Sequence, residues 1–124
     1  MSKARSRLIS YADREFGTAY GFTTEVHFGR QEKHLPGRKG FVPGKSPITI
    51  GIVELQKLVE TRAGTGERRG PNRELVEFGS VIGRYVNRQG GTSVPTTRGM
   101  IHYSSKGAHV VPALPEPPKR RKAT

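Results

Sequence analysis

Glycine and proline divide this sequence into short segments, and that division limits the possible fold more than any other feature does. The 124 residues include 16 glycines and nine prolines. Both residues recur so often between residues 29 and 47 that no long helix or strand can form there. We therefore expect a long loop, which is also rich in lysine and arginine. Loops of this length in small domains are usually functional or disordered.

The segments between these breaks predict a mixed fold. Apolar residues recur at helical spacing in residues 51–63 and 4–16, so both segments are expected to be helices. Residues 22–28 alternate between apolar and polar side chains, as half-buried strands do. Further short β-like runs occupy residues 75–78, 81–86, 99–104 and 108–111. Helices followed by an antiparallel meander indicate an α+β domain.

Three parts follow from this pattern: a helical extension in residues 1–20, one main domain in residues 21–112, and a tail in residues 113–124. The tail combines proline with a run of four basic residues, so it is predicted to be disordered. The chain has no cysteine, which excludes a disulfide scaffold, a zinc finger and a thiol nucleophile. It shows neither a transmembrane segment nor a signal peptide, so any export is expected to depend on another domain or machine.

The charge distribution favours a polyanionic partner. Lysine and arginine number 22 against 10 acidic residues, which gives a net charge of +12. Basic segments in residues 26–53 and 78–115 flank a neutral segment in residues 54–77. Such a surface suits nucleic acid or an acidic protein. The alternative is a solvated basic surface without a partner.

The segment from residue 101 to residue 112 carries the most informative pattern. A two-residue turn at Lys106-Gly107 would pair Ser104 with His109 and make His102 a diagonal neighbour of His109. All three side chains would then share one face of a hairpin. The opposite, apolar face would belong to the core, and it comprises Ile101, Tyr103, Ala108 and Val110. A three-residue turn would instead place the two histidines on opposite faces.

Two histidines on one face could act on a phosphodiester. An imidazole titrates near neutral pH, so one ring can remove a proton while the other donates one. RNA supplies its own nucleophile, the 2′-hydroxyl, and nearby cations would stabilise the added charge without a metal. Candidate cations are Lys33, Arg38, Arg98 and Lys106. The alternative is a pair of surface histidines with no function.

A third histidine, His34, lies in the basic loop beside Lys33. Lys45 and Ser46 add possible phosphate donors from the same loop. A single loop histidine is more often simply solvated, so the position alone is a weak indication. His27, on the predicted strand, is expected to be structural.

The chain resembles the polymorphic toxin type 50 domain over residues 26–115. Similar segments end some phage head-morphogenesis proteins. Two positions depart conservatively from the family pattern, since Leu35 and Val110 stand where isoleucine is common. The resemblance rests on Gln31-Glu32-Lys33-His34-Leu35-Pro36-Gly37, Gly44-Lys45-Ser46, Val81-Ile82-Gly83 and the segment from Ile101 to Pro112.

The resemblance implies a fold like that of barnase, EndoU, colicin-type and RelE-like nucleases, in which helices precede a twisted antiparallel sheet that binds RNA. It also implies a metal-independent endoribonuclease without a cofactor. Such domains usually form the C-terminal effector of a larger secreted toxin, act in the cytoplasm of the target cell, and are neutralised by an immunity protein. Charge complementarity predicts that this partner is acidic.

The resulting hypothesis is a toxin ribonuclease in which His102 and His109 divide the base and acid roles. His34 or Lys33 completes the site, and Ser104 and Thr97 position the substrate. The alternatives are a non-catalytic RNA-binding or phage virion-associated module, and a nuclease that acts on DNA. The full set of candidates comprises His34, His102, Ser104 and His109 for catalysis, and Lys33, Arg38, Lys45, Ser46, Thr97, Arg98 and Lys106 for substrate binding.

Overall fold

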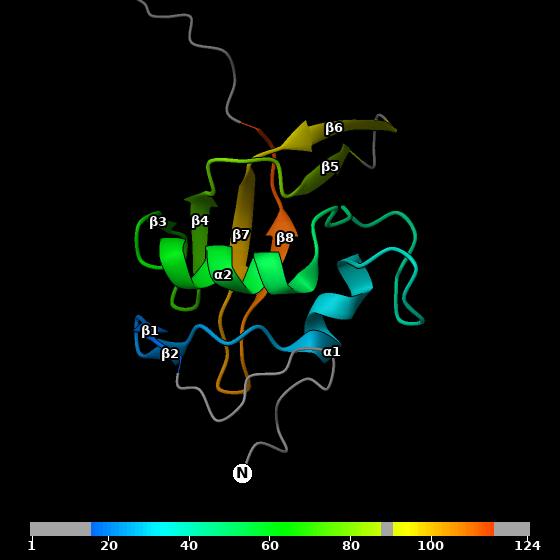
Figure 1. The fold of residues 1–124 in the computed structure, drawn as a ribbon. Coiled ribbons are helices and arrows are strands. Elements are labelled where there is room, and N and C mark those ends of the chain that lie inside the picture. Colours follow the sequence, from blue (N-terminus) through cyan, green and yellow to red (C-terminus); the bar gives the residue numbers. More distant parts are fainter. Residues whose placement is uncertain (1–15, 88–90, 116–124) are drawn as a thin grey trace, which may run out of the picture.

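A computed structural model of the chain describes residues 16–87 and 91–115. Its centre is a four-stranded antiparallel sheet with the strand order β3-β4-β7-β8. Helix α2 lies across one face of this sheet (Figure 1). The sheet strands and the helix are β3 (Glu67–Arg68), β4 (Arg73–Glu77), β7 (Arg98–His102), β8 (His109–Pro112) and α2 (Ile52–Arg62).

Smaller elements surround this centre. Two hairpins pair β1 with β2 and β5 with β6. The short helix α1 runs directly into a 3-10 turn, η2, at the β8 edge of the sheet. These elements are β1 (Thr18–Ala19), β2 (Phe22–Thr23), α1 (Phe28–Gln31), η2 (Glu32–His34), β5 (Gly83–Asn87) and β6 (Thr92–Thr96).

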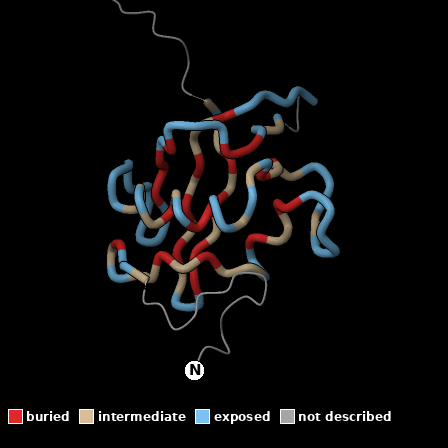
Figure 2. The backbone as a smooth tube through the Cα atoms, in the orientation of Figure 1, coloured by how far each residue is buried: buried red, intermediate tan, exposed pale blue. Residues whose placement is uncertain are grey.

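The core lies between α2 and the sheet. Leu55 and Val59 of α2 belong to one buried cluster with Ile101 and Val110 of the sheet. Figure 2 shows buried positions, in red, along the sheet strands and on the helix that covers them. Full burial of an aliphatic side chain stabilises the folded state by about 1.5–3 kcal/mol. The apolar residues of 51–63 recur at helical spacing because that spacing places them on the side of α2 that packs against the sheet. The predicted helix and the predicted core side of the hairpin, including Tyr103 at 1% exposure, are both confirmed.

The predicted strand at residues 22–28 is wrong beyond its first two residues. Only Phe22–Thr23 forms a strand, and Val26 makes an isolated bridge to Ala108. His27 then caps α1, because its Nδ1 accepts a hydrogen bond from the Arg30 N–H at 3.2 Å. This cap lets a helix begin where alternation predicted a strand, so α1 and η2 occupy the first part of the predicted loop.

The α+β class is confirmed in its coarse form, as helix combined with mainly antiparallel strands. The predicted packing of N-terminal helices on the sheet is not established. The helix expected in residues 4–16 lies outside the described residues except for its last position, as does the tail from residue 116 onward. Strands β3 and β6 were not predicted. Pro95 lies within β6, and proline in a segment argues against a strand because it has no N–H to donate.

None of the helices in residues 16–87 and 91–115 is both long and apolar enough to cross a membrane.

Candidate active site

The candidate site begins with two histidines on neighbouring strands. His102 of β7 lies directly opposite His109 of β8. Their imidazole rings stack with centroids 4.8 Å apart and an angle of 12° between the planes. The predicted proximity of the two histidines is therefore confirmed, although they are cross-strand partners and not diagonal neighbours.

The predicted register of this hairpin is wrong by two residues. The strands are joined by residues 103–108, because Ala108 binds a distant segment: its N–H donates to the Glu25 carbonyl and its carbonyl accepts from the His27 N–H, both at 2.8 Å. The shift is even, so the two histidines keep a common face. Ser104, however, leaves the strand, and its hydroxyl donates to the Gly107 carbonyl at 2.8 Å.

His34 joins the pair from η2. Its ring centroid lies 6.2 Å from that of His109, with 19° between the planes. Gln31 brings this segment to the sheet, because its buried side chain accepts from the Val110 N–H at 2.7 Å and donates to the Val110 carbonyl at 2.8 Å. We call His34, His102 and His109 the imidazole cluster.

The hydrogen bond of His34 determines which of its ring nitrogens is free. Nδ1 lies 2.9 Å from the carbonyl oxygen of Ser46, and a carbonyl can only accept. Nδ1 therefore carries a hydrogen, and Nε2 of the neutral ring keeps its lone pair. The hydroxyl of Ser46 accepts from the Val86 N–H at 2.9 Å, which ties this loop to β5.

The imidazole cluster lies in a positive field. Burial lowers the pKa of all three histidines, and nearby cations lower it further. Lys33 acts on every ring, Arg73 acts on His102, and Arg30 acts on His109. The pKa of His109 falls to about 3, because burial and the other two histidines add to these charges. The rings are therefore neutral at pH 7 and surrounded by charges that favour an anionic ligand.

His109 has a further unusual feature. Its Nδ1 is buried and has no hydrogen-bond partner. A buried polar atom without a partner is costly, so a ligand that supplies a hydrogen-bond partner to this atom is favoured. The observation supports a functional role for this ring.

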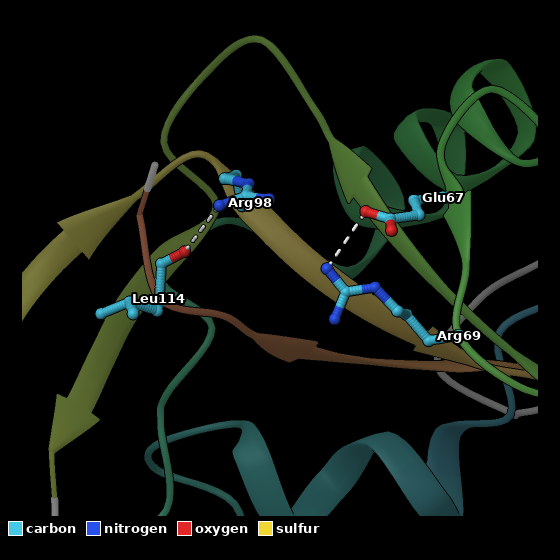
Figure 3. Close-up of polar contacts among 4 residues, drawn as sticks. All are labelled: Glu67, Arg69, Arg98 and Leu114. Carbon is cyan, nitrogen blue, oxygen red and sulfur yellow. Dashed lines mark hydrogen bonds and ion pairs between the residues drawn. The ribbon is translucent and has the colours of Figure 1, made fainter. Parts of the chain in front are cut away.

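Two of the predicted substrate-binding cations, Lys33 and Lys45, lie close enough to the imidazole cluster to lower histidine pKa values. Arg98 shares the sheet face of His102 but lies at the far end of β7, where its Nη1 donates to the Leu114 carbonyl at 3.3 Å (Figure 3). Arg38 lies over the Phe28 ring, with 5.7 Å to the centroid.

The remaining candidates have other contacts. The Thr97 carbonyl accepts from the Phe78 N–H, next to Arg98. Lys106 lines a hollow of about 480 Å³ between the β2–α1 segment and the β7–β8 connection. The buried Ser46 reaches His34 through its carbonyl and not its hydroxyl. The structure therefore assembles the three histidines with Lys33 and Lys45, but it does not bring Thr97 or Arg98 to them.

Three residues of the site were missed. Arg73 lies opposite His102 on β4. It belongs to residues 54–77, whose charges sum to zero, so the net charge of the segment did not single it out. Arg30 was counted only as part of a basic loop. Gln31 carries no signal by itself, because a buried glutamine is recognised only once its partners are known.

In residues 16–87 and 91–115, no group of three or more histidine or acidic side chains is arranged to hold a metal ion.

The fold and this site define a small, basic α+β domain with clustered imidazoles on one sheet face. The chain belongs to the bacterial toxin 50 family, whose sequence profile matches residues 26–112. The match begins just before α1 and ends with β8, so it includes all three histidines of the cluster. Among proteins of curated function, none matches the chain.

The imidazole cluster is expected to make the fold less stable in acid. The histidine pKa values are lower in the folded chain than the ordinary value near 6.5, so the unfolded chain binds more protons below that pH. Stability is therefore full above about pH 6.5 and declines as the pH falls toward the folded value of about 3. His109→Phe keeps an aromatic ring but removes the titration, so its melting temperature should fall less between pH 7 and pH 4.5.

Thermal unfolding followed by circular dichroism measures this effect. Lys57→Ala, an exposed change on α2, should keep the acid sensitivity of the parent. An identical decline in the parent and His109→Phe would contradict the lowered pKa of His109.

Proposed function

We propose that this domain is the toxic part of an effector and cleaves RNA as a metal-independent endoribonuclease. The single observation that carries the proposal is the imidazole cluster, with His102 and His109 stacked at 4.8 Å and cations around them. The family membership supports the role of a toxin. The choice of RNA rests on the chemistry of the site, because two imidazoles suffice where the substrate brings its own nucleophile.

The proposed reaction is an internal transesterification. A neutral imidazole removes the proton of the 2′-hydroxyl, and the O2′ forms a bond to the adjacent phosphorus. The bond between phosphorus and O5′ breaks, and a protonated imidazole gives its proton to the departing O5′. The products are a 2′,3′-cyclic phosphate and a 5′-hydroxyl. As a proposal, His102 and His109 divide these two roles, and His34 completes the site.

The electrostatics suit both roles once the substrate is bound. The lowered pKa values keep the free rings neutral, which a base requires. A bound phosphodiester brings a negative charge that opposes the effect of Lys33, Arg30 and Arg73, so it raises the histidine pKa values. One ring can then hold the proton that the leaving oxygen needs. The same cations stabilise the charge of the phosphorane.

The same cations are the expected contact for an inhibitor. A cognate immunity protein that is acidic at the contact surface would cover Arg30, Lys33 and Arg73 and thereby block the imidazole cluster. We further propose that the domain is delivered as part of a larger effector and acts in the cytoplasm of the target cell.

Cleavage of a defined oligonucleotide tests the proposed reaction. The purified chain should cut total cellular RNA in excess EDTA and leave 2′,3′-cyclic phosphate ends. A DNA oligonucleotide with one ribonucleotide should be cut only after that nucleotide, and its all-deoxy counterpart should remain intact. Cutting of the all-deoxy strand would identify a DNA nuclease. Binding of RNA without any cleavage would identify a non-catalytic RNA-binding module.

A further inference from the structure

A second row of side chains crosses the sheet next to the imidazole cluster. Met100 of β7 lies opposite Leu75 of β4 on one side and opposite Val111 of β8 on the other. Side chains alternate along a strand, so these residues share the face of His102 and His109, two positions farther along. That separation corresponds to about 7 Å.

Two residues of this apolar row, Met100 and Val111, are not part of the core. Ile101 and Val110, which point to the opposite face, are fully buried against α2, whereas Met100 and Val111 are only half-buried. Leu75 is buried at 9% exposure, so the apolar surface of the row comes from Met100 and Val111. These two residues present apolar surface beside the candidate site. We call Met100 and Val111 the apolar shelf.

Positive charge borders the shelf at both ends. Arg73 and the imidazole cluster lie on one side, and Arg98 lies on the other, two positions farther along β7. Acidic side chains on this face occur toward β3 and β4. Glu67 lies opposite Leu75 and is paired with Arg69 at 3.1 Å (Figure 3). Glu77 lies opposite Arg98. An anionic strand is therefore favoured over β7 and β8, where Met100 and Val111 form the shelf.

We propose that the apolar shelf holds a nucleobase of the substrate, from one of the two nucleotides that flank the scissile phosphate. This inference rests on the proposed function, since it takes the imidazole cluster as the place of the phosphate. A base lying on a methionine and a valine is bound through its apolar face and not through its edge, so the contact tolerates different bases. A base inside a duplex has both faces covered, so the shelf selects single-stranded RNA.

Removing a base from the substrate and the Met100 side chain from the protein, separately and together, tests the shelf. The substrates are three oligonucleotides with one ribonucleotide: one carries all bases, and the others lack the base on the 5′ or the 3′ side of the scissile phosphate. For the parent, kcat/KM should fall by about 2- to 12-fold when one particular base is missing, the range expected for one methionine side chain against an aromatic ring. The kcat/KM of Met100→Ala on the complete substrate should be lower than that of the parent by a similar factor. Removal of the same base should then lower the kcat/KM of Met100→Ala only slightly further.

Two control variants separate a base contact from general damage. Met100→Leu keeps the apolar surface and should retain most of the activity. Val53→Ala shortens an exposed valine of α2, on the other side of the sheet, and should behave as the parent does. Annealing the complete substrate to its complement should suppress cleavage by the parent.

The shelf and the proposed function can fail separately. Equal kcat/KM for all three substrates, or an equal loss of Met100→Ala on each of them, would overturn the shelf while leaving the ribonuclease intact. If the parent cleaves none of them, the proposed function fails. The same comparison is then made by fluorescence anisotropy of binding, where a base-dependent effect of Met100→Ala supports the shelf and its absence refutes it.

Discussion

Replacing either His102 or His109 by alanine is expected to lower the rate of RNA cleavage by about 10²- to 10⁴-fold, the usual contribution of a general acid or base. Each variant removes one of two rings that stack at 4.8 Å, and no other imidazole occupies its place. The measurement is kcat/KM on a single-ribonucleotide substrate. The melting temperature is recorded for each variant, so that loss of the site is distinguished from loss of the fold.

The control for this prediction is Lys57→Ala. It removes a positive charge from α2, on the opposite face of the sheet, so it should retain activity within a factor of about two. Retention of full activity by both histidine variants would contradict the assignment of the site. RNA affinity that persists in a parent without cleavage would instead support the binding module.

A change of leaving group separates the two roles. A ribonucleoside 3′-(4-nitrophenyl phosphate) keeps the 2′-hydroxyl but releases a phenolate that needs no proton, so the general acid becomes dispensable while the base does not. One of the two variants should recover most of its rate on this substrate, and that variant lacks the acid. Recovery of both variants, or of neither, would show that His102 and His109 do not divide the roles in this way.

The sequence predicted those parts of the fold that depend on local periodicity. The helical spacing of Leu55 and Val59 predicted α2, and strict alternation around Ile101 and Val110 predicted which side of the hairpin is buried. A hairpin with one apolar face tolerates only even shifts of register. The common face of His102 and His109 was therefore predictable even though the register was not.

Contacts between distant segments determined what the sequence could not reveal. The β7–β8 connection widens because Ala108 binds Glu25 and His27, which are more than 80 positions away in the chain. His34 reaches the site because Gln31 binds Val110, 79 positions away. Neither glutamine nor alanine carries a local signal for such a contact. The resemblance to a toxin family, rather than spacing, singled out His34.

A buried carboxyl group gives the second large effect. Glu74→Leu is expected to destabilise the fold by about 3–5 kcal/mol, because each donor that loses its acceptor away from water costs about 1–3 kcal/mol. Glu74 is fully buried, and its carboxylate accepts from the Tyr103 hydroxyl at 2.6 Å and from the N–H groups of Gly64 and Gly66 at 3.0 and 2.6 Å. Leucine leaves the buried Tyr103 hydroxyl and the two partly buried N–H groups without this acceptor. Urea denaturation measures the free energy of unfolding.

A milder variant keeps the prediction testable if Glu74→Leu does not fold. Tyr103→Phe removes one of the three donors, so it should cost about 1–2 kcal/mol, and it leaves the carboxylate with two partners. Glu77→Gln is the matched control, because Glu77 lies on the same strand but is exposed, and it should stay within about 0.5 kcal/mol of the parent. A Glu74→Leu variant as stable as Glu77→Gln would contradict the network.

This carboxylate also connects the two sides of the molecule. The carboxylate accepts hydrogen bonds from the N–H groups of Gly64 and Gly66 in the turn that follows α2. It also accepts from the hydroxyl of Tyr103, the residue that follows His102. Burial and the Glu74 carboxylate raise the pKa of the Tyr103 phenol, so the phenol keeps its hydrogen and donates it at neutral pH. Glu74 therefore stabilises the strand end on which the imidazole cluster depends, and its loss should impair cleavage only to the extent that it unfolds the chain.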